Sequence, residues 1–284
     1  MLKTEMRNPA STHIDRMSTL EMLQLINQEN MNAVRAVEAA TPEIARACNA
    51  VAACFEKGGR LFYIGCGTSG RIGVIDAAEC PPTYGVPRDQ VIGIIAGGLK
   101  CMAQAAENEE DDASAGRRDL SAYQITANDA VMGISSAGGA AYVVGALEYA
   151  RSQGACTISL SSNADTAIER AADIAIITDT GAEVVTGSTR MKSGTAQKLV
   201  LNMISTCAMI KTGKVYENMM INLKPSNIKL RERMLRIVCE IKGCNMAEAE
   251  RLLESNNWNI RQAVSKGINS IVDDIYRDIP SEKV

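Results

Sequence analysis

The sequence predicts an α/β fold built on a parallel β-sheet. Five short runs are apolar along their whole length, as expected for strands that are buried on both faces. Helical patterns separate most of these runs, and glycine-rich or hydroxyl-rich segments follow several of them. Strands that alternate with helices in this way are typical of a parallel sheet covered on both faces. The predicted strands lie at residues 60–64, 91–96, 130–135, 156–160 and 174–178.

Helices are predicted before, between and after these strands. Ser18-Thr19-Leu20-Glu21 has the pattern of a capping box, and apolar residues follow it at helical spacing. A second helix is predicted at 41–56, where Gly58-Gly59 provides a stop signal. Further helices are predicted at about 142–153, 194–210, 247–253 and 260–264.

The chain is predicted to have three parts, because the strands stop and the charge density rises near residue 227. An N-terminal helical segment is expected at residues 1–57. An α/β domain that carries the binding site is expected at 58–226, and a small helical module at 227–284.

The composition argues against several classes of function. The 284 residues include 30 Lys and Arg against 33 Asp and Glu, and only 4% are aromatic. This balance and the scarcity of aromatic side chains argue against nucleic-acid binding. No apolar run reaches the roughly 20 residues of a membrane-spanning helix, and the N-terminus lacks the apolar core of a secretory signal. We therefore expect a cytoplasmic protein without a membrane or nucleic-acid partner.

Cysteine and histidine usage limits the chemistry further. The nine cysteines are odd in number and contain no C-x-x-C pair, so neither a disulfide framework nor a structural zinc site is expected. Most of them lie in apolar runs, as small buried side chains do in a reducing compartment. His13 is the single histidine, which excludes a histidine-based triad or a multi-histidine metal site within one chain. No metal is expected.

The loop after the first predicted strand has the features of a phosphate site. Residues 65–70 match the dinucleotide fingerprint G-x-G-x-x-G, but the second strand ends without the acidic residue that would bind ribose. Instead, Thr68 and Ser69 place two hydroxyls next to Gly67, and Arg71 follows. Backbone N–H groups and hydroxyls at a helix N-terminus suit a phosphate monoester, although a tight turn without a ligand is the alternative.

Two further strand ends are rich in hydroxyl groups. Ser135 and Ser136 follow the third strand and lead through small residues into a helix. The segment 181–198, after the fifth strand, combines glycines with an acid, several hydroxyls and cations. Because ligands bind at the carboxyl ends of parallel strands, these residues are predicted to bind a sugar phosphate. The candidates in the second segment are Glu183, Ser188, Thr189 and Lys192.

Carboxylates near the same edge are candidates for acid–base chemistry. Pro81 and Pro82 are predicted to end the helix that follows the first strand, which leaves Glu79 at its C-terminal edge. The helix dipole disfavours an anion there, so Glu79 is either a protonated general acid or a solvated side chain. An acidic helix is predicted after the second strand, and one of its members could face the cleft. Its acidic residues are Glu107, Glu109, Glu110, Asp111 and Asp112.

Three long strings carry a resemblance to a known family. They are Gly-Thr-Ser-Gly-Arg at 67–71, Asp-Ala-Ala-Glu-Cys-Pro-Pro-Thr-Tyr-Gly at 76–85 and Glu-Val-Val-Thr-Gly-Ser-Thr-Arg-Met-Lys at 183–192. These strings resemble the signatures of the N-acetylmuramic acid 6-phosphate etherases. The resemblance implies a flavodoxin-like sugar isomerase (SIS) domain with a five-stranded parallel sheet, followed by a helical module similar to ubiquitin-associated (UBA) domains. It also implies a homodimer with the site near the subunit interface, and no cofactor or metal.

The resemblance implies a lyase that takes part in cell-wall amino-sugar recycling. Its reaction would convert N-acetylmuramic acid 6-phosphate into N-acetylglucosamine 6-phosphate and D-lactate, by elimination and then addition of water. By motif, Glu79 would be the acid and Glu110 the second catalytic carboxyl, with Glu109 as its close rival. The phosphate would bind the hydroxyls of the glycine-rich loop, with help from residues 188–189.

The sequence departs from the family pattern after the third strand, where Ala137 stands for a serine and Gly139 for an arginine. After the second strand, Leu99 stands where the family usually has a glutamate. These changes leave open whether that loop binds phosphate and which sugar is accepted. Three alternatives remain, of which the altered loop supports the first. One is a non-catalytic sugar-phosphate sensor similar to the glucokinase regulatory protein. The others are a sugar-phosphate isomerase and, least favoured, a dinucleotide-dependent oxidoreductase.

Overall fold

The structure, a computed structural model, describes residues 1–104, 109–225 and 227–265. Internal contacts divide the chain into two compact units. The first, called here the sheet unit, contains Met1–Cys80 and Pro87–Thr212, and the second, the C-terminal unit, contains Pro81–Val86 and the chain from Gly213 onward. The domain boundaries expected from the sequence, at 57/58 and 226/227, remain predictions.

The sheet unit is built on five parallel strands, and the predicted strands are confirmed with ends that agree within one residue. The order in the sheet is β2-β1-β3-β4-β5, so the chain changes direction across the sheet after β2. Strands β1 and β3 are buried along their whole length, which explains their uninterrupted apolar sequence. The strands are β1 (Leu61–Gly65), β2 (Val91–Ile95), β3 (Ala130–Ile134), β4 (Cys156–Ser161) and β5 (Ile174–Ile177).

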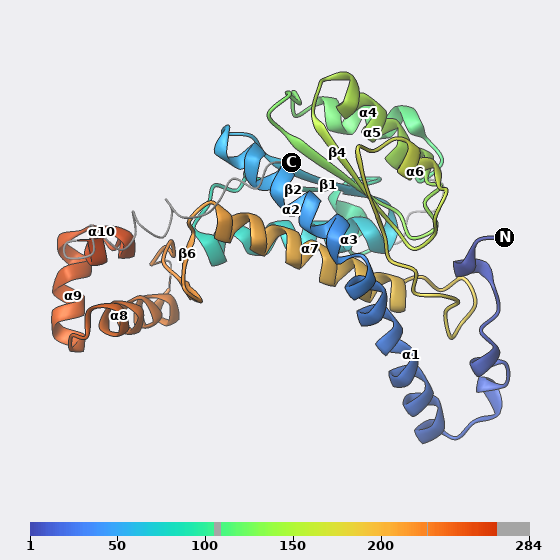
Figure 1. Cartoon of the computed structure of the whole chain (residues 1–284), viewed down its shortest axis with the longest axis horizontal. Coiled ribbons are helices and arrows are strands. Elements are labelled where there is room, and N and C mark those ends of the chain that lie inside the picture. The colour runs from blue at the N-terminus through green and yellow to red at the C-terminus, as the bar shows by residue number, and fades with distance from the viewer. Residues whose placement is uncertain (105–108, 226, 266–284) are drawn as a thin grey trace. The chain divides into compact units, whose positions relative to one another are not determined.

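Helices cover both faces of this sheet (Figure 1). On one face Gly73 packs against Tyr63, and on the other Gly133 lies under Val143. The first face is covered by α2 (Thr41–Glu56), α3 (Gly67–Tyr84) and α7 (Lys192–Lys211), with α1 (Thr19–Ala39) packed on α7. The second face is covered by α4 (Ala113–Ser121), α5 (Ala141–Ser152) and α6 (Ala167–Arg170). None of the helices that the structure describes has the length and apolar composition to cross a membrane.

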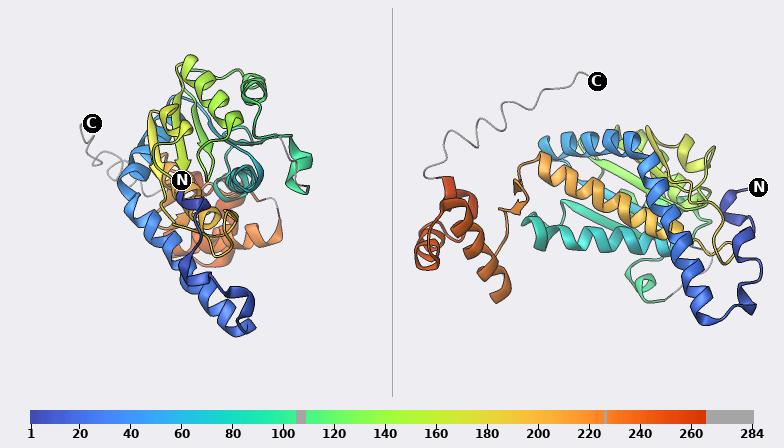
Figure 2. Two further views of the ribbon diagram at one scale, coloured as in Figure 1. Left: turned by 90° about the vertical axis from the view of Figure 1, so that its right-hand side faces the viewer. Right: turned by 60° about the horizontal axis from the view of Figure 1, so that its bottom comes forward.

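The N-terminal segment contacts the loops that follow β4 and β5 before α1 begins (Figure 2). It consists of three 3-10 turns, at Lys3–Glu5, Pro9–Ser11 and Ile14–Arg16. The predicted capping box at Ser18 and Glu21 is confirmed and begins α1. The α-helices of this part of the chain are therefore α1 and α2.

Helix α3 continues through Pro81 and Pro82 to Tyr84, so the prediction that these prolines end the helix is wrong. The two rings remove only their own N–H donors, and the Gly85 N–H closes the last turn by donating to the Pro81 carbonyl at 2.9 Å. One turn earlier, the Asp76 carboxylate accepts a hydrogen bond of 2.9 Å from the Tyr63 hydroxyl. This hydrogen bond anchors the preceding part of α3 to β1.

The C-terminal unit has its own apolar core. Gly243 ends α8 in the left-handed conformation (φ 63°) and turns the chain into α9. Trp258, which precedes α10, lies beneath the guanidinium of Arg231 at 5.1 Å from the ring centre. The elements of this unit are β6 (Val215–Tyr216), β7 (Met219–Met220), α8 (Ile228–Lys242), α9 (Met246–Ser255) and α10 (Ile260–Ser265).

Two glycines allow α4 and α5 to approach closely. A Cβ atom on Gly116 would lie 1.9 Å from the Tyr142 carbonyl oxygen, and one on Gly145 would lie 2.1 Å from the Ala113 carbonyl oxygen. The close approach matters for the site, because the acidic residues 109–111 lie immediately before α4.

We expect Gly116→Ala to lower the free energy of unfolding by about 1–3 kcal/mol, since the added methyl group must push the helices apart. Gly139→Ala is the matched control, because a Cβ atom there meets nothing within 4 Å. Urea denaturation followed by far-UV circular dichroism measures both. Equal stability of the two variants would contradict the close packing.

Candidate active site

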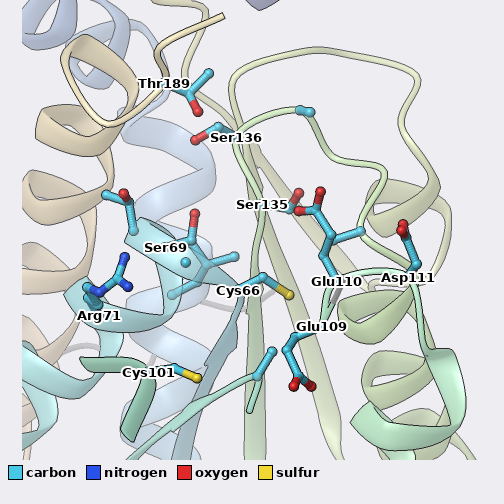
Figure 3. Close-up of a pocket in the computed structure, with 16 residues that line it drawn as sticks. Cys66, Ser69, Arg71, Cys101, Glu109, Glu110, Asp111, Ser135, Ser136 and Thr189 are labelled. Carbon is cyan, nitrogen blue, oxygen red and sulfur yellow. The ribbon is translucent and has the colours of Figure 1, made fainter. Parts of the chain in front are cut away.

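A cavity of about 490 Å³ opens at the carboxyl edge of the sheet, beside the ends of β1 and β3 (Figure 3). The residues proposed from the sequence that line it are Gly67, Thr68, Ser69, Glu110, Ser135, Ser136 and Thr189. Those that do not line it are Glu79, Glu183, Ser188 and Lys192. The structure thus brings hydroxyls from three loops together with one of the two proposed catalytic carboxylates.

The turn from β1 into α3 forms one wall of the cavity. Gly65 and Gly70 touch across this turn, where a Cβ atom on Gly70 would lie 2.5 Å from the Gly65 carbonyl oxygen. Gly67, at φ +51°, begins α3 in a conformation that favours glycine. The first N–H groups of a helix have no partner within it, so this end of α3 directs backbone donors to the region of Thr68 and Ser69. The arrangement suits an anion.

The loop after β3 forms the facing wall. The Ser135 hydroxyl oxygen accepts a hydrogen bond from the Gly138 N–H at 3.1 Å. The Ser136 hydroxyl oxygen accepts one from the Gln197 side-chain amide at 2.9 Å. Ala137 also lines the cavity, at the position where the family resemblance predicts a serine. Sequence reasoning missed Gln197, since it lies on α7, far from the loop in the sequence.

The acidic segment before α4 is a turn, and the prediction of an acidic helix is wrong where the structure describes it. Asp112 is the N-cap of α4, and its carboxylate accepts hydrogen bonds from the N–H groups of Ser114 and Ala115 at 2.8 and 3.0 Å. A carboxylate that caps free N–H groups begins a helix at that residue, which explains the difference. Glu107 lies outside the described residues.

Glu110 and Glu109 take different positions in the cavity. The Tyr142 N–H donates to the Glu110 carbonyl at 3.0 Å and so fixes this residue beside the start of α5. In Figure 3 the Glu110 carboxylate points toward Ser135, whereas the Glu109 carboxylate points the other way. Glu109 lies against Gly97, where a Cβ atom would come within 3.3 Å of its carboxyl carbon. Glu110 is therefore the carboxylate that faces the hydroxyl-lined part of the cavity.

The thiol of Cys66, which also lines the cavity, has restricted chemistry. Burial, and then the nearby charges of Glu110, Asp111 and Glu109, raise the pKa of the Cys66 thiol to about 12. The thiol therefore remains protonated at neutral pH and is a poor nucleophile. Among the described residues, no group of three or more His, Cys, Asp or Glu side chains is placed to hold a metal ion.

Arg71 is the single cation among the described residues that line the cavity. Its guanidinium donates to the carbonyl oxygens of Met102 and Gln104 at 3.1 and 3.2 Å. It thereby holds the 3-10 turn Leu99–Met102 and the residues after it beside α3. These bonds use two of its five N–H donors, so the cavity relies on neutral donors as well as on this charge.

Glu183 and Lys192 are buried, and they hold in place the loop that carries Thr189. Glu183 is fully buried, and its carboxylate accepts from the backbone N–H groups of Lys192 and Ser193 at 3.2 and 3.0 Å. The Lys192 ammonium, on a residue that is 2% exposed, donates to Glu29 at 2.6 Å and to the Ala182 carbonyl at 2.7 Å. These contacts fix the position of the loop.

The Glu29 carboxylate also accepts from the Asn8 side chain at 2.7 Å, so the N-terminal segment joins the same cluster. Burial raises the pKa of Glu29, but the hydrogen bonds from Lys192 and Asn8 and the charge of Lys192 outweigh it and lower the pKa. The Glu29 carboxylate is therefore ionised at neutral pH.

Comparisons with known proteins agree with this architecture. A family model for the glucokinase regulatory protein N-terminal SIS domain matches residues 43–151, and one for the SIS domain matches 112–206. A UBA-like domain model matches residues 238–266. A phosphoheptose isomerase structure from Francisella tularensis aligns with a TM-score of 0.52 and 17% identity over 68% of this chain and all of that chain, a likeness of fold.

Relatives that are far more similar decide the family. An N-acetylmuramic acid 6-phosphate etherase from Aeromonas hydrophila is 54% identical over 92% of this chain and 88% of its own length. The N-acetylmuramic acid 6-phosphate etherase 2 of Vibrio parahaemolyticus is 53% identical over 93% and 88%. The chain belongs to the N-acetylmuramic acid 6-phosphate etherase family. The etherase resemblance, the SIS fold and the UBA-like module predicted from the sequence are thereby confirmed.

We expect Lys192→Met to lower the free energy of unfolding of this etherase-family protein by roughly 3 kcal/mol, because it leaves Glu29 without its buried countercharge. Lys198→Met is the control on the same helix, since Lys198 is exposed. Urea denaturation followed by circular dichroism provides the measurement. A second variant, Lys192→Met with Glu29→Gln, should recover part of the loss, and no recovery would contradict the pairing.

Proposed function

We propose that this protein cleaves the D-lactyl ether of N-acetylmuramic acid 6-phosphate and releases N-acetylglucosamine 6-phosphate and D-lactate. One observation carries the proposal beyond family membership. The Glu110 carboxylate lines the same cavity as the hydroxyls and the helix N-terminus that suit a phosphate. All nine cysteines are free thiols, which supports action in a reducing cytoplasm.

The proposed chemistry needs a base at C2 of the sugar. Opening of the ring makes C1 an aldehyde, which acidifies the C2 proton. Glu110 takes that proton, the C2–H electrons form the C2–C3 double bond, and the C3–O bond breaks with its electrons on the lactyl oxygen. Water then adds at C3, and C2 regains a proton. A positioned carboxylate contributes a factor of about 10²–10⁴ to such a step.

The leaving lactyl oxygen needs a proton, and we assign this acid to Glu79 of a second copy of the chain. Glu79 is exposed on α3 and does not line the cavity of its own chain. Exposed apolar side chains at helical spacing along α1 support pairing between copies, because together they form a stripe of apolar surface. They are Leu20, Leu23, Met31 and Val34. The proposed assembly is thus a homodimer with shared sites.

D-lactate release from N-acetylmuramic acid 6-phosphate tests the chemistry. We expect Glu110→Gln and Glu79→Gln each to lower kcat by about 10²–10⁴-fold, since each variant loses one proton-transfer group. Glu109→Gln is the matched control and should keep most of the activity. Loss of turnover in Glu109→Gln with an active Glu110→Gln would reverse the assignment. Binding of the sugar phosphate without lactate release by the unaltered protein would instead favour a non-catalytic sensor.

A mixed dimer tests the shared site. Co-expression of Glu79→Gln and Glu110→Gln chains with different tags, followed by purification on both tags, isolates the heterodimer. If the two residues meet across a twofold interface, one site has both lesions and the other has none, so about half of the normal activity should return. A heterodimer as inactive as the two parent homodimers would place both residues within one chain.

A further inference from the structure

A buried amide on α7 makes a hydrogen bond to one hydroxyl in the cavity, and this bond determines whether the hydroxyl can donate to a ligand. Gln197 is 1% exposed, and its side-chain N–H donates to the Ser136 hydroxyl oxygen at 2.9 Å. Ser136 itself lines the cavity. The Ser136 backbone carbonyl is also fixed, because it accepts from the Ser162 N–H at 3.0 Å and from the Asn163 side chain at 3.1 Å.

The direction of this hydrogen bond decides what Ser136 offers to a ligand. A hydroxyl has one proton and two acceptor lone pairs, so a hydroxyl that accepts from an amide N–H still has its proton to donate. No acceptor for that proton is found among the described residues. Ser135 follows the same rule, since its hydroxyl oxygen accepts from the Gly138 N–H. The loop after β3 therefore presents two hydroxyl donors toward the cavity.

Hydroxyls that are held as hydrogen-bond donors are important here, because the cavity has little positive charge. Glu109, Glu110 and Asp111 line it, whereas Arg71 is the single cation among its described lining residues. An anionic ligand must therefore be bound largely by neutral donors. A hydroxyl that rotated to act as a hydrogen-bond acceptor would contribute little to the binding of such a ligand.

The remaining atom of the amide argues against a purely stabilising role for Gln197. Its carbonyl oxygen Oε1 is buried and has no hydrogen-bond partner among the residues that the structure describes. A buried acceptor without a partner lowers the stability of the fold, and a methionine of similar length would avoid that cost. The amide is therefore better explained by its action on Ser136 than by packing.

We propose that Gln197 is a positioning residue that holds the Ser136 hydroxyl as a donor to the phosphate group of the sugar phosphate. The inference rests on the proposed function, because it assigns the anion to the ligand of the same cavity. It adds a residue that touches no substrate and acts through Ser136.

The test compares stability with binding in Gln197→Met, using N-acetylglucosamine 6-phosphate in titration calorimetry. We expect the affinity to fall about three- to tenfold, and the melting temperature to stay unchanged or rise. The KM for N-acetylmuramic acid 6-phosphate should rise with little change in kcat. Gln197→Glu should weaken binding further, because its carboxylate accepts the Ser136 proton and adds a negative charge.

Ser136→Ala provides the matched background. In that background Gln197→Met should change the affinity no further, since the hydroxyl on which it acts is gone. A lower melting temperature with unchanged affinity, or an equal loss of affinity in both backgrounds, would overturn the inference. Failure of the unaltered protein to bind the sugar phosphate would overturn both proposals. Binding without lactate release would overturn the etherase function alone and leave the Gln197 effect measurable.

Discussion

A buried ion pair between Lys192 and Glu29 joins parts of the chain that are far apart in the sequence. Glu29 belongs to α1, Lys192 begins α7, and Asn8 brings the N-terminal segment to the same carboxylate. Lys192 also contacts the Ala182 carbonyl, and the next residue, Glu183, caps the first N–H groups of α7. Buried charges are costly unless they are paired, so these partners specify one another. The position of Thr189 at the cavity depends on them.

The sequence predicted the strands and the edge at which they end, because continuous apolar runs and the residues after them are local patterns. It did not predict which polar side chains would reach the ligand. Glu183 and Lys192 have the chemistry of a phosphate site, but the folded chain uses them for a helix end and a buried ion pair. Spacing cannot distinguish these uses, since both place polar residues before a helix.

Two predictions about helix ends failed for a related reason. Proline and acidic residues are good local signals, but contacts from elsewhere decide whether a helix continues. Helix α3 continues through Pro81 and Pro82, and the Gly85 N–H closes its last turn on the Pro81 carbonyl. Asp112 caps α4, so the acidic residues before it form a turn that presents Glu110. That turn positions Glu110, and α5 holds the residue there through the hydrogen bond from the Tyr142 N–H to the Glu110 carbonyl.

The stacking of Arg231 on Trp258 has a practical consequence for spectroscopy. Trp258 is the single tryptophan of the chain, and it lies in the C-terminal unit. Its emission therefore follows the unfolding of that unit, whereas far-UV circular dichroism is dominated by the larger sheet unit. Transitions that coincide in the two signals would indicate that the units unfold together. Transitions that separate would resolve the two units in one unlabelled sample.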